Sequence, residues 1–126
     1  MKKFGLILLG LCISFGAMSQ AVIEFEADTH DFGKFYEQDG EVSVEFKFTN
    51  TGDAPLLITN VQAGCGCTRP TWTRTPVEPG ESGVILVMYN PRGRPGAFNR
   101  AITVTTNMPE PTTRIWIRGE VIRREE

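Results

Sequence analysis

Residues 41–49 read EVSVEFKFT, and this stretch decides the fold class. Its apolar side chains, Val42, Val44, Phe46 and Phe48, alternate with polar ones. A period of two is typical of a β-strand that buries one face and leaves the other in water. The stretch therefore predicts a strand in a sheet with one solvated face.

Similar runs recur along the chain and are separated by turn-forming residues. Residues 22–27 and 30–35 resemble one first strand, broken at Asp28 and again at Gly33, and further runs lie at 56–63, 84–89, 98–105 and 113–122. Within 56–63 the alternation slips after Ile58, which predicts a bulge or a strand end near Asn60. No segment has the periodicity of a helix. The residues expected to line one core are Val42, Val44, Phe46, Phe48, Ile102, Val104, Ile115 and Ile117.

About seven short strands in a chain of this size predict an all-β fold, an immunoglobulin-like antiparallel β-sandwich. Residues 20–126 have the length of one domain with a modest core. An antibody-type domain carries a cysteine on its second strand and another on its sixth, and those strands have none here. The sandwich is therefore expected to hold without an inter-sheet disulfide.

Residues 1–19 have the features of a secretory signal peptide. Lys2 and Lys3 precede a mostly apolar run at 4–15, which is shorter than the roughly 20 residues that span a bilayer. Small residues at 17 and 19 predict cleavage after Ser19, which also removes Cys12. Export to the periplasm or the extracellular space is expected, with no membrane span after cleavage.

The charge balance argues against nucleic acid as a partner, because such binding depends on many Lys and Arg contacts to phosphates. The 13 basic side chains of the full sequence fall to 11 when Lys2 and Lys3 are removed, against 15 acidic ones, for a net charge of −4. All nine basic residues after position 60 are arginines. They are either ordinary solvated residues or an arginine-lined face for an acidic partner or glycan.

Several motifs, taken in order, resemble the bacterial domain-of-unknown-function 1573 family. They are DFGK at 31–34, VEFKFTNTG at 44–52, PLLI at 55–58, CGCT at 65–68, PGE at 79–81 and GEV at 119–121. The resemblance covers residues 22–122. It implies an exported immunoglobulin-like domain similar to Hydin-type and major-sperm-protein-type sandwiches, which are mostly binding or scaffolding modules, and it implies no reaction.

Cys65 and Cys67 are the only cysteines after the signal peptide. In an extended segment their Cα atoms would lie roughly 6.5–7 Å apart, at the upper limit of the about 4.4–6.8 Å usual for a disulfide. Gly66 between them allows the backbone to bend. Three interpretations stay open: a local disulfide, a thiolate pair that binds a soft ion such as Cu(I), and thiol exchange with a partner. Zinc needs more ligands than one such chain offers.

The two tryptophans and one apolar strand are the candidate interface residues. Trp72 either fills an edge of the core or presents its ring to a partner. Trp116 has the opposite parity to Ile115 and Ile117, which predicts that it lies on an outer face. If Leu86 and Met88 also point outward, they and Trp116 would form an exposed apolar patch, a common mark of an interface.

Catalysis is not expected, because the sequence has no pattern that holds a base beside a nucleophile. His30 is the only histidine, and its neighbour Asp31 should point to the opposite face of the strand. No cofactor is indicated. The sequence therefore predicts a non-catalytic cell-envelope module that binds protein or glycan, with a thiol-redox or Cu(I)-handling function at Cys65 and Cys67 as the alternative.

Intact mass spectrometry of the protein purified from the cell envelope tests the processing and the cysteines together. The expected mass corresponds to residues 20–126 less the two hydrogens lost when one disulfide forms. Treatment with dithiothreitol should restore those two hydrogens. An uncut chain would contradict the signal peptide, and a retained metal that a copper chelator removes would favour the Cu(I) interpretation.

Overall fold

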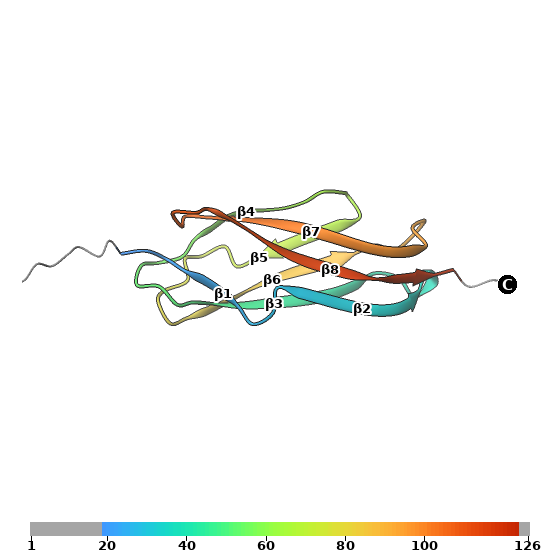
Figure 1. Cartoon of the computed structure of the whole chain (residues 1–126), viewed down its shortest axis with the longest axis horizontal. Helices are drawn as coiled ribbons and strands as arrows, with labels where there is room; N and C mark the ends of the chain where they lie inside the picture. The colour runs from blue at the N-terminus through green and yellow to red at the C-terminus, as the bar shows by residue number, and fades with distance from the viewer. Residues whose placement is uncertain (1–18, 124–126) are drawn as a thin grey trace, which may run out of the picture.

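A computed structural model describes residues 19–123, which form a β-sandwich of two four-stranded sheets (Figure 1). The first sheet has the order β1-β3-β6-β5 and contains β1 (Ile23–Phe25), β3 (Val42–Asn50), β6 (Ser82–Tyr89) and β5 (Thr68–Trp72). The second has the order β2-β8-β7-β4 and contains β2 (Thr29–Tyr36), β8 (Thr112–Ile122), β7 (Gly96–Thr106) and β4 (Ile58–Ala63). The all-β sandwich predicted from the sequence is confirmed. The predicted signal peptide lies outside the described residues, apart from its last residue, Ser19.

The broken first strand becomes two strands that belong to different sheets. β1 pairs antiparallel with β3, whereas β2 pairs parallel with β8, the one parallel pair among the described strands. The register shifts between Asp31 and Lys34, where Gly33 has a φ of 73°, a conformation that glycine adopts without strain. The predicted irregularity near Asn60 is also present, as a register shift between Ile58 and Asn60.

The sequence patterns did not predict β5, which ends at Trp72. Pro70 lies in the middle of β5, and a proline there removes one donor from the hydrogen-bond ladder. The strand tolerates it because β5 is at the edge of its sheet and pairs only with β6. The alternation of apolar and polar residues therefore does not predict this edge strand, because it is short, mostly polar and contains a proline.

The core between the sheets contains most of the residues expected there. Phe48, Ile102, Val104, Ile115 and Ile117 have no exposed surface, and Phe46 is buried as well. Val42 and Val44 point the same way but are only half-buried. Their part of β3 pairs with β6 but not with β1, which pairs only with residues 48–50.

Asn50 is a fully buried polar residue whose side chain makes four hydrogen bonds. Its Oδ1 accepts from the backbone N–H groups of Val22, at 3.3 Å, and Gly52, at 2.9 Å. Its Nδ2 donates to the carbonyl oxygens of Ala54 and Val77, both at 2.8 Å. One amide thus ties the start of the domain, the turn after β3 and the segment before β6 together.

Gly52 completes this arrangement because the N-terminal segment passes directly over it. A Cβ atom at this position would collide with the carbonyl oxygen of Gln20 and lie 2.7 Å from the nitrogen of Val22. The same segment is held by a hydrogen bond from the Thr51 N–H to the Val22 carbonyl, at 2.9 Å. The Asn-Thr-Gly sequence at 50–52 is therefore the anchor of the N-terminal strand.

Replacing Asn50 by alanine should lower the free energy of unfolding by about 3 kcal/mol, because it leaves several buried backbone groups without a partner. Asn107 offers a matched control, since its exposed amide bonds only to Leu57 and Pro55. Asn107→Ala should lower the same quantity by about 1 kcal/mol. Urea denaturation measures both. Equal losses for the two variants would contradict the role given to Asn50.

Candidate binding face

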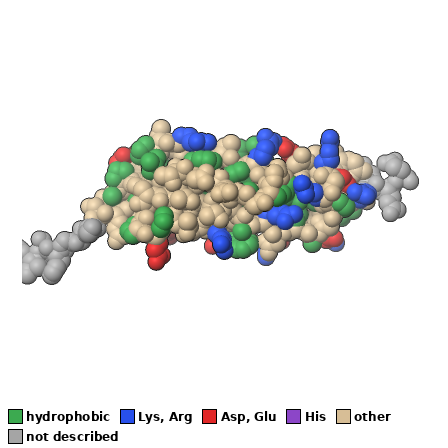
Figure 2. All heavy atoms as spheres, turned by 90° about the horizontal axis from the view of Figure 1, so that it is seen from above, with side chains coloured by type: hydrophobic (Ala, Val, Ile, Leu, Met, Phe, Trp, Pro, Cys, Tyr) green, Lys and Arg blue, Asp and Glu red, His purple; other side chains and the backbone are tan. Residues whose placement is uncertain are grey.

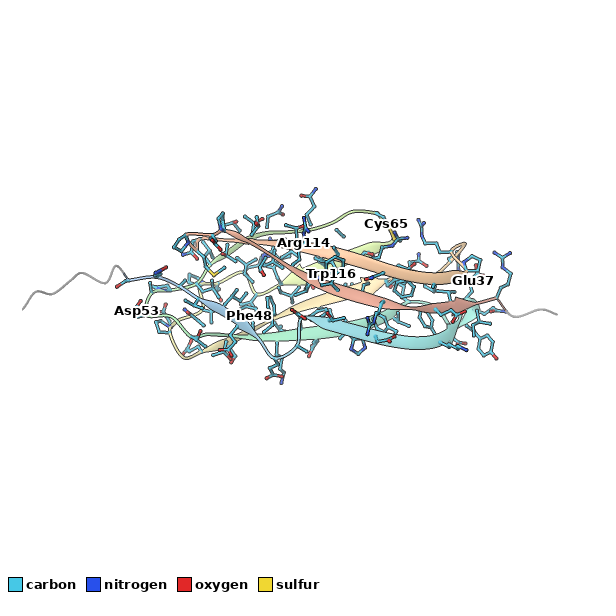
Figure 3. The ribbon with its side chains drawn as sticks, viewed as in Figure 1. Glu37, Phe48, Asp53, Cys65, Arg114 and Trp116 are labelled. Carbon is cyan, nitrogen blue, oxygen red and sulfur yellow. A yellow bond between two sulfur atoms is a disulfide. The ribbon has the colours of Figure 1, made fainter. Side chains whose placement is uncertain are left out.

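The alternation along β8 places an aromatic ring and two cations on the outer face of the second sheet. Ile115 and Ile117 have no exposed surface, so Trp116 between them points away from the core and is partly exposed. Arg114 and Arg118 are two positions away on either side, and both are exposed. Figure 3 shows Arg114 and Trp116 together near the middle of the molecule. We call the outer surface of β8, β7 and β4 around Trp116 the Trp116 face.

Short or uncharged polar side chains surround this ring. Across the sheet, Trp116 is paired with Ala101 on β7 and with Thr29 on β2. The other outward positions in register with this part of β8 are Asn99, Thr103 and Thr105 on β7, and Asn60 and Gln62 on β4. Because these side chains are short beside an indole, the face beside the ring is open and rich in amide and hydroxyl groups.

The Trp116 face carries two cations, of which one is paired with a carboxylate and the other is not. Arg118 lies 3.5 Å from a carboxylate oxygen of Asp31, and both side chains are more than half exposed. Arg114 makes no ion pair or side-chain hydrogen bond within residues 19–123. The outward positions of β7 and β4 carry no acid. The space-filling view of the β4 side shows basic side chains spread over that surface, with acidic ones mostly at its margins (Figure 2).

Large apolar side chains other than Trp116 are absent from the described part of this face. The most exposed large hydrophobic residues in 19–123 are Val22 and Tyr36. Val22 precedes β1, in the other sheet. Tyr36 is paired with Ile122 at the far end of β8, six residues from Trp116. The ring of Trp116 is thus a single aromatic on an otherwise polar surface.

The apolar patch predicted from Trp116, Leu86 and Met88 does not form, and that prediction is wrong. Leu86 and Met88 do alternate with the buried residues of β6 and point outward, half-buried. However, β6 belongs to the first sheet and β8 to the second, so their outer faces lie on opposite sides of the sandwich. Parity in the sequence identifies the outer face of a strand but does not say which sheet the strand joins.

Trp72 lies at the edge of the core. It is the register partner of Ile85, which is fully buried, and it packs against the core cluster while remaining half-buried. The guanidinium carbon of Arg74 lies 3.8 Å from the ring centroid, a cation–π contact that covers it. The indole Nε1 is buried without a hydrogen-bond partner. This position fits the core-filling alternative better than presentation to a partner.

Cys65 and Cys67 form a disulfide at the corner where the chain passes from β4 in one sheet to β5 in the other. Their Cα atoms are 5.3 Å apart, closer than an extended segment would place them. The corner is held by a hydrogen bond from the Thr68 N–H to the Cys65 carbonyl, at 3.2 Å, and by one from the Asn90 N–H to the Cys67 carbonyl, at 2.8 Å. The disulfide is local and does not link the sheets, as expected.

A second charged cluster lies at the end of the molecule that carries η1 (Glu37–Asp39), where Figure 3 labels Glu37. The N–H of Gly93 donates to Glu37 at 2.6 Å, and Arg123 donates at 3.2 Å; both lower the pKa of that carboxyl. Arg69 is paired with Glu41 at 2.7 Å. Glu37, Glu41 and Arg92 line a hollow at this end. Its carboxylates are already paired with donors of the same chain, so it is a weaker candidate than the Trp116 face.

The structure brings together no acid–base pair at His30. Its ring packs edge-on against Phe32, with centroids 4.7 Å apart, whereas Asp31 faces Gly33 and Arg118. Within residues 19–123, no three His, Cys, Asp or Glu side chains gather in a way that could hold a metal ion. The only helical segment described there is the short turn η1, and no helix in that range is long and apolar enough to cross a membrane.

Sequence reasoning named Trp116 but missed its neighbours. Arg114 and Arg118 share its parity, so the period of two that placed Trp116 outward could also have placed them beside it. Ala101, Gln62 and the other residues of β7 and β4 carry no comparable signal. Their position next to Trp116 depends on strand order and register, which a single sequence does not show.

A family model described as "Protein of unknown function (DUF1573)" matches residues 23–121. The chain belongs to the DUF1573 family. This match covers the sandwich from β1 to the end of β8, in agreement with the resemblance seen in the sequence motifs. The sequence has no significant match among curated proteins.

Solved structures with the same fold include a protein of unknown function from Porphyromonas gingivalis W83, with a TM-score of 0.71 and 20% identity over 85% of this chain and 50% of that one. The secreted serine protease VesC from Vibrio cholerae matches with a TM-score of 0.58 and 13% identity over 79% of this chain and 23% of that one. A C. elegans MSP family member, WR4, matches with a TM-score of 0.51 and 11% identity over 82% and 99%. The DUF1573 chain thus spans half the length of the P. gingivalis protein, and these likenesses establish the fold alone.

Proposed function

We propose that this DUF1573 chain is an exported, non-catalytic module of the cell envelope that binds a protein or glycan ligand on the Trp116 face. The observation that carries the proposal is the outward position of Trp116 between Arg114 and Arg118, on a sheet whose other face is fully buried at Ile115 and Ile117. Aromatic and arginine side chains supply much of the energy at binding sites. Inward side chains already fill the core beneath β8, so packing of the core does not require a partly exposed indole at this position.

Binding without chemistry fits the described residues. Catalysis by side chains needs a nucleophile and a base within hydrogen-bond reach. The one histidine packs on Phe32. The Trp116 face offers amides, hydroxyls and guanidiniums, which recognise a ligand through hydrogen bonds and charge.

Export is supported by two independent features. The N-terminal 19 residues have the composition of a signal peptide. Disulfides form and persist in oxidising compartments outside the cytosol, and Cys65 and Cys67 are bonded to each other.

The sulfur-based alternative is less well supported than the binding function. Both sulfurs are engaged in the disulfide, and Cys67 is almost fully buried. Cu(I) binding requires the two thiolates, so a reductant would have to open the bond first. The position of the bond, at the corner between the sheets, favours a structural role that holds β4 and β5 in place.

Substituting serine for Trp116 tests the binding function. Trp116→Ser should leave the melting temperature nearly unchanged, because outer-face substitutions usually change stability by no more than about 0.5 kcal/mol. It should weaken binding of the purified protein to isolated cell envelopes at least about tenfold, as expected for an aromatic anchor. Co-sedimentation of protein with envelopes measures the bound fraction.

Two variants make this test specific. Trp116→Tyr keeps an aromatic ring and should retain most of the binding. Tyr36→Ser removes the other exposed aromatic of the same sheet, far from Trp116, and should bind as the wild type does. The proposal fails if Trp116→Ser binds envelopes as tightly as the wild type. It also fails if Trp116→Ser unfolds and Trp116→Tyr binds envelopes no better than Trp116→Ser does.

A further inference from the structure

The composition of the Trp116 face discriminates between a protein and a glycan as its ligand. Stable protein interfaces bury about 800 Å² on each partner and have an apolar core of several residues. Here one indole stands among Ala101, Thr103 and Gln62, and the next exposed large apolar residue of this sheet is Tyr36, at the far end of β2. A sugar ring needs only one aromatic platform for its apolar side, with hydroxyl-binding groups around it.

The charges of the face discriminate between a neutral and an acidic ligand. Arg114 has no carboxylate partner within residues 19–123, and the outward positions of β7 and β4 carry no acid. Arg118 has Asp31 at 3.5 Å, but an exposed pair of this kind contributes little and exchanges readily. Both guanidiniums are therefore available to carboxylate or phosphate oxygens, which they bind through two parallel hydrogen bonds.

The spacing of the two arginines indicates the length of the ligand. Four residues along a strand separate Arg114 from Arg118, which places their Cα atoms about 13 Å apart with Trp116 midway. A sugar stacked on the indole therefore lies between the two arginines along the strand. A chain of several sugars laid along β8 can contact one arginine, the ring and the other arginine in turn.

We infer that the Trp116 face binds an anionic glycan chain, one that carries carboxylate or phosphate groups along its length. This inference rests on the proposed binding function and names its ligand class. Nucleic acid has similar charge and stacking groups, but its affinity depends on many cationic contacts. Only two arginines stand on this part of β8, and the chain after signal removal has 15 acidic against 11 basic side chains.

Isothermal titration with defined polymers tests the inference on the purified full-length exported protein. Polygalacturonate supplies carboxylates, and its carboxyl-reduced form is the neutral control. A phosphorylated mannan and its dephosphorylated form make the corresponding phosphate pair. The wild type should bind at least one acidic polymer about tenfold more tightly than its neutral control at low salt, and this difference should shrink as salt rises.

Variants connect the affinity to the face. Arg114→Gln should lower the affinity for the acidic polymer about tenfold, to the level of the neutral one, while its melting temperature stays unchanged. Trp116→Ser should lower affinity for both forms. Arg94→Gln, in the loop between β6 and β7, removes the same charge elsewhere and should have no effect.

The outcomes separate the ligand class from the function. Equal affinity for acidic and neutral polymers, or an Arg114→Gln variant with wild-type affinity, overturns the anionic glycan even where Trp116→Ser still loses envelope binding. Tighter Arg114-dependent binding of single-stranded DNA than of either acidic polymer overturns it in favour of nucleic acid. Wild-type envelope binding by Trp116→Ser overturns the proposed function itself.

Discussion

The burial of Ile115 and Ile117 is the constraint on which the candidate site depends. Both side chains are fully enclosed between the two sheets. A shift of the β8 register by one residue would therefore point them outward, to the solvent. The same constraint holds Arg114, Trp116 and Arg118 on the outer face. Burying two isoleucines stabilises the fold by several kcal/mol, about 2 for each, and it fixes the direction in which the proposed binding residues point.

A face fixed in this way suits binding better than a loop would. Trp116 lies on β8, which is paired with β7 on one side and with β2 on the other. The ring and its neighbours are therefore held in place before any ligand binds. Less conformational entropy is then lost on binding. The buried amide of Asn50 and the disulfide at the β4–β5 corner hold other parts of the same sandwich, and neither needs to touch the ligand.

Local alternation was enough to predict much of this molecule from its sequence. It identified the strands around Phe46, Val104 and Ile117, the outward position of Trp116 and the irregularity near Asn60, because each depends only on neighbours along the chain. It failed where the answer depends on pairing. β5 was missed because Pro70 masks an edge strand, and Leu86 and Met88 were grouped with Trp116 because parity does not assign a strand to a sheet. Alternation could also have placed Arg114 beside Trp116. The positions of Ala101 and Gln62 near Trp116 depend on the strand register, which alternation does not give.

The proposed ligand contacts are confined to the outer surface of β8, β7 and β4. The most direct measurement is a nuclear magnetic resonance titration of the isotopically labelled protein with an acidic oligosaccharide, following every backbone amide and the indole N–H of Trp116. Shifts should cluster at residues 60–62, 99–105 and 112–118 and at the Trp116 indole, whereas the outer face of β6 and the end around Glu37 should stay unchanged. Shifts that cluster at Leu86 and Met88, or at Glu37 and Arg92, would contradict it.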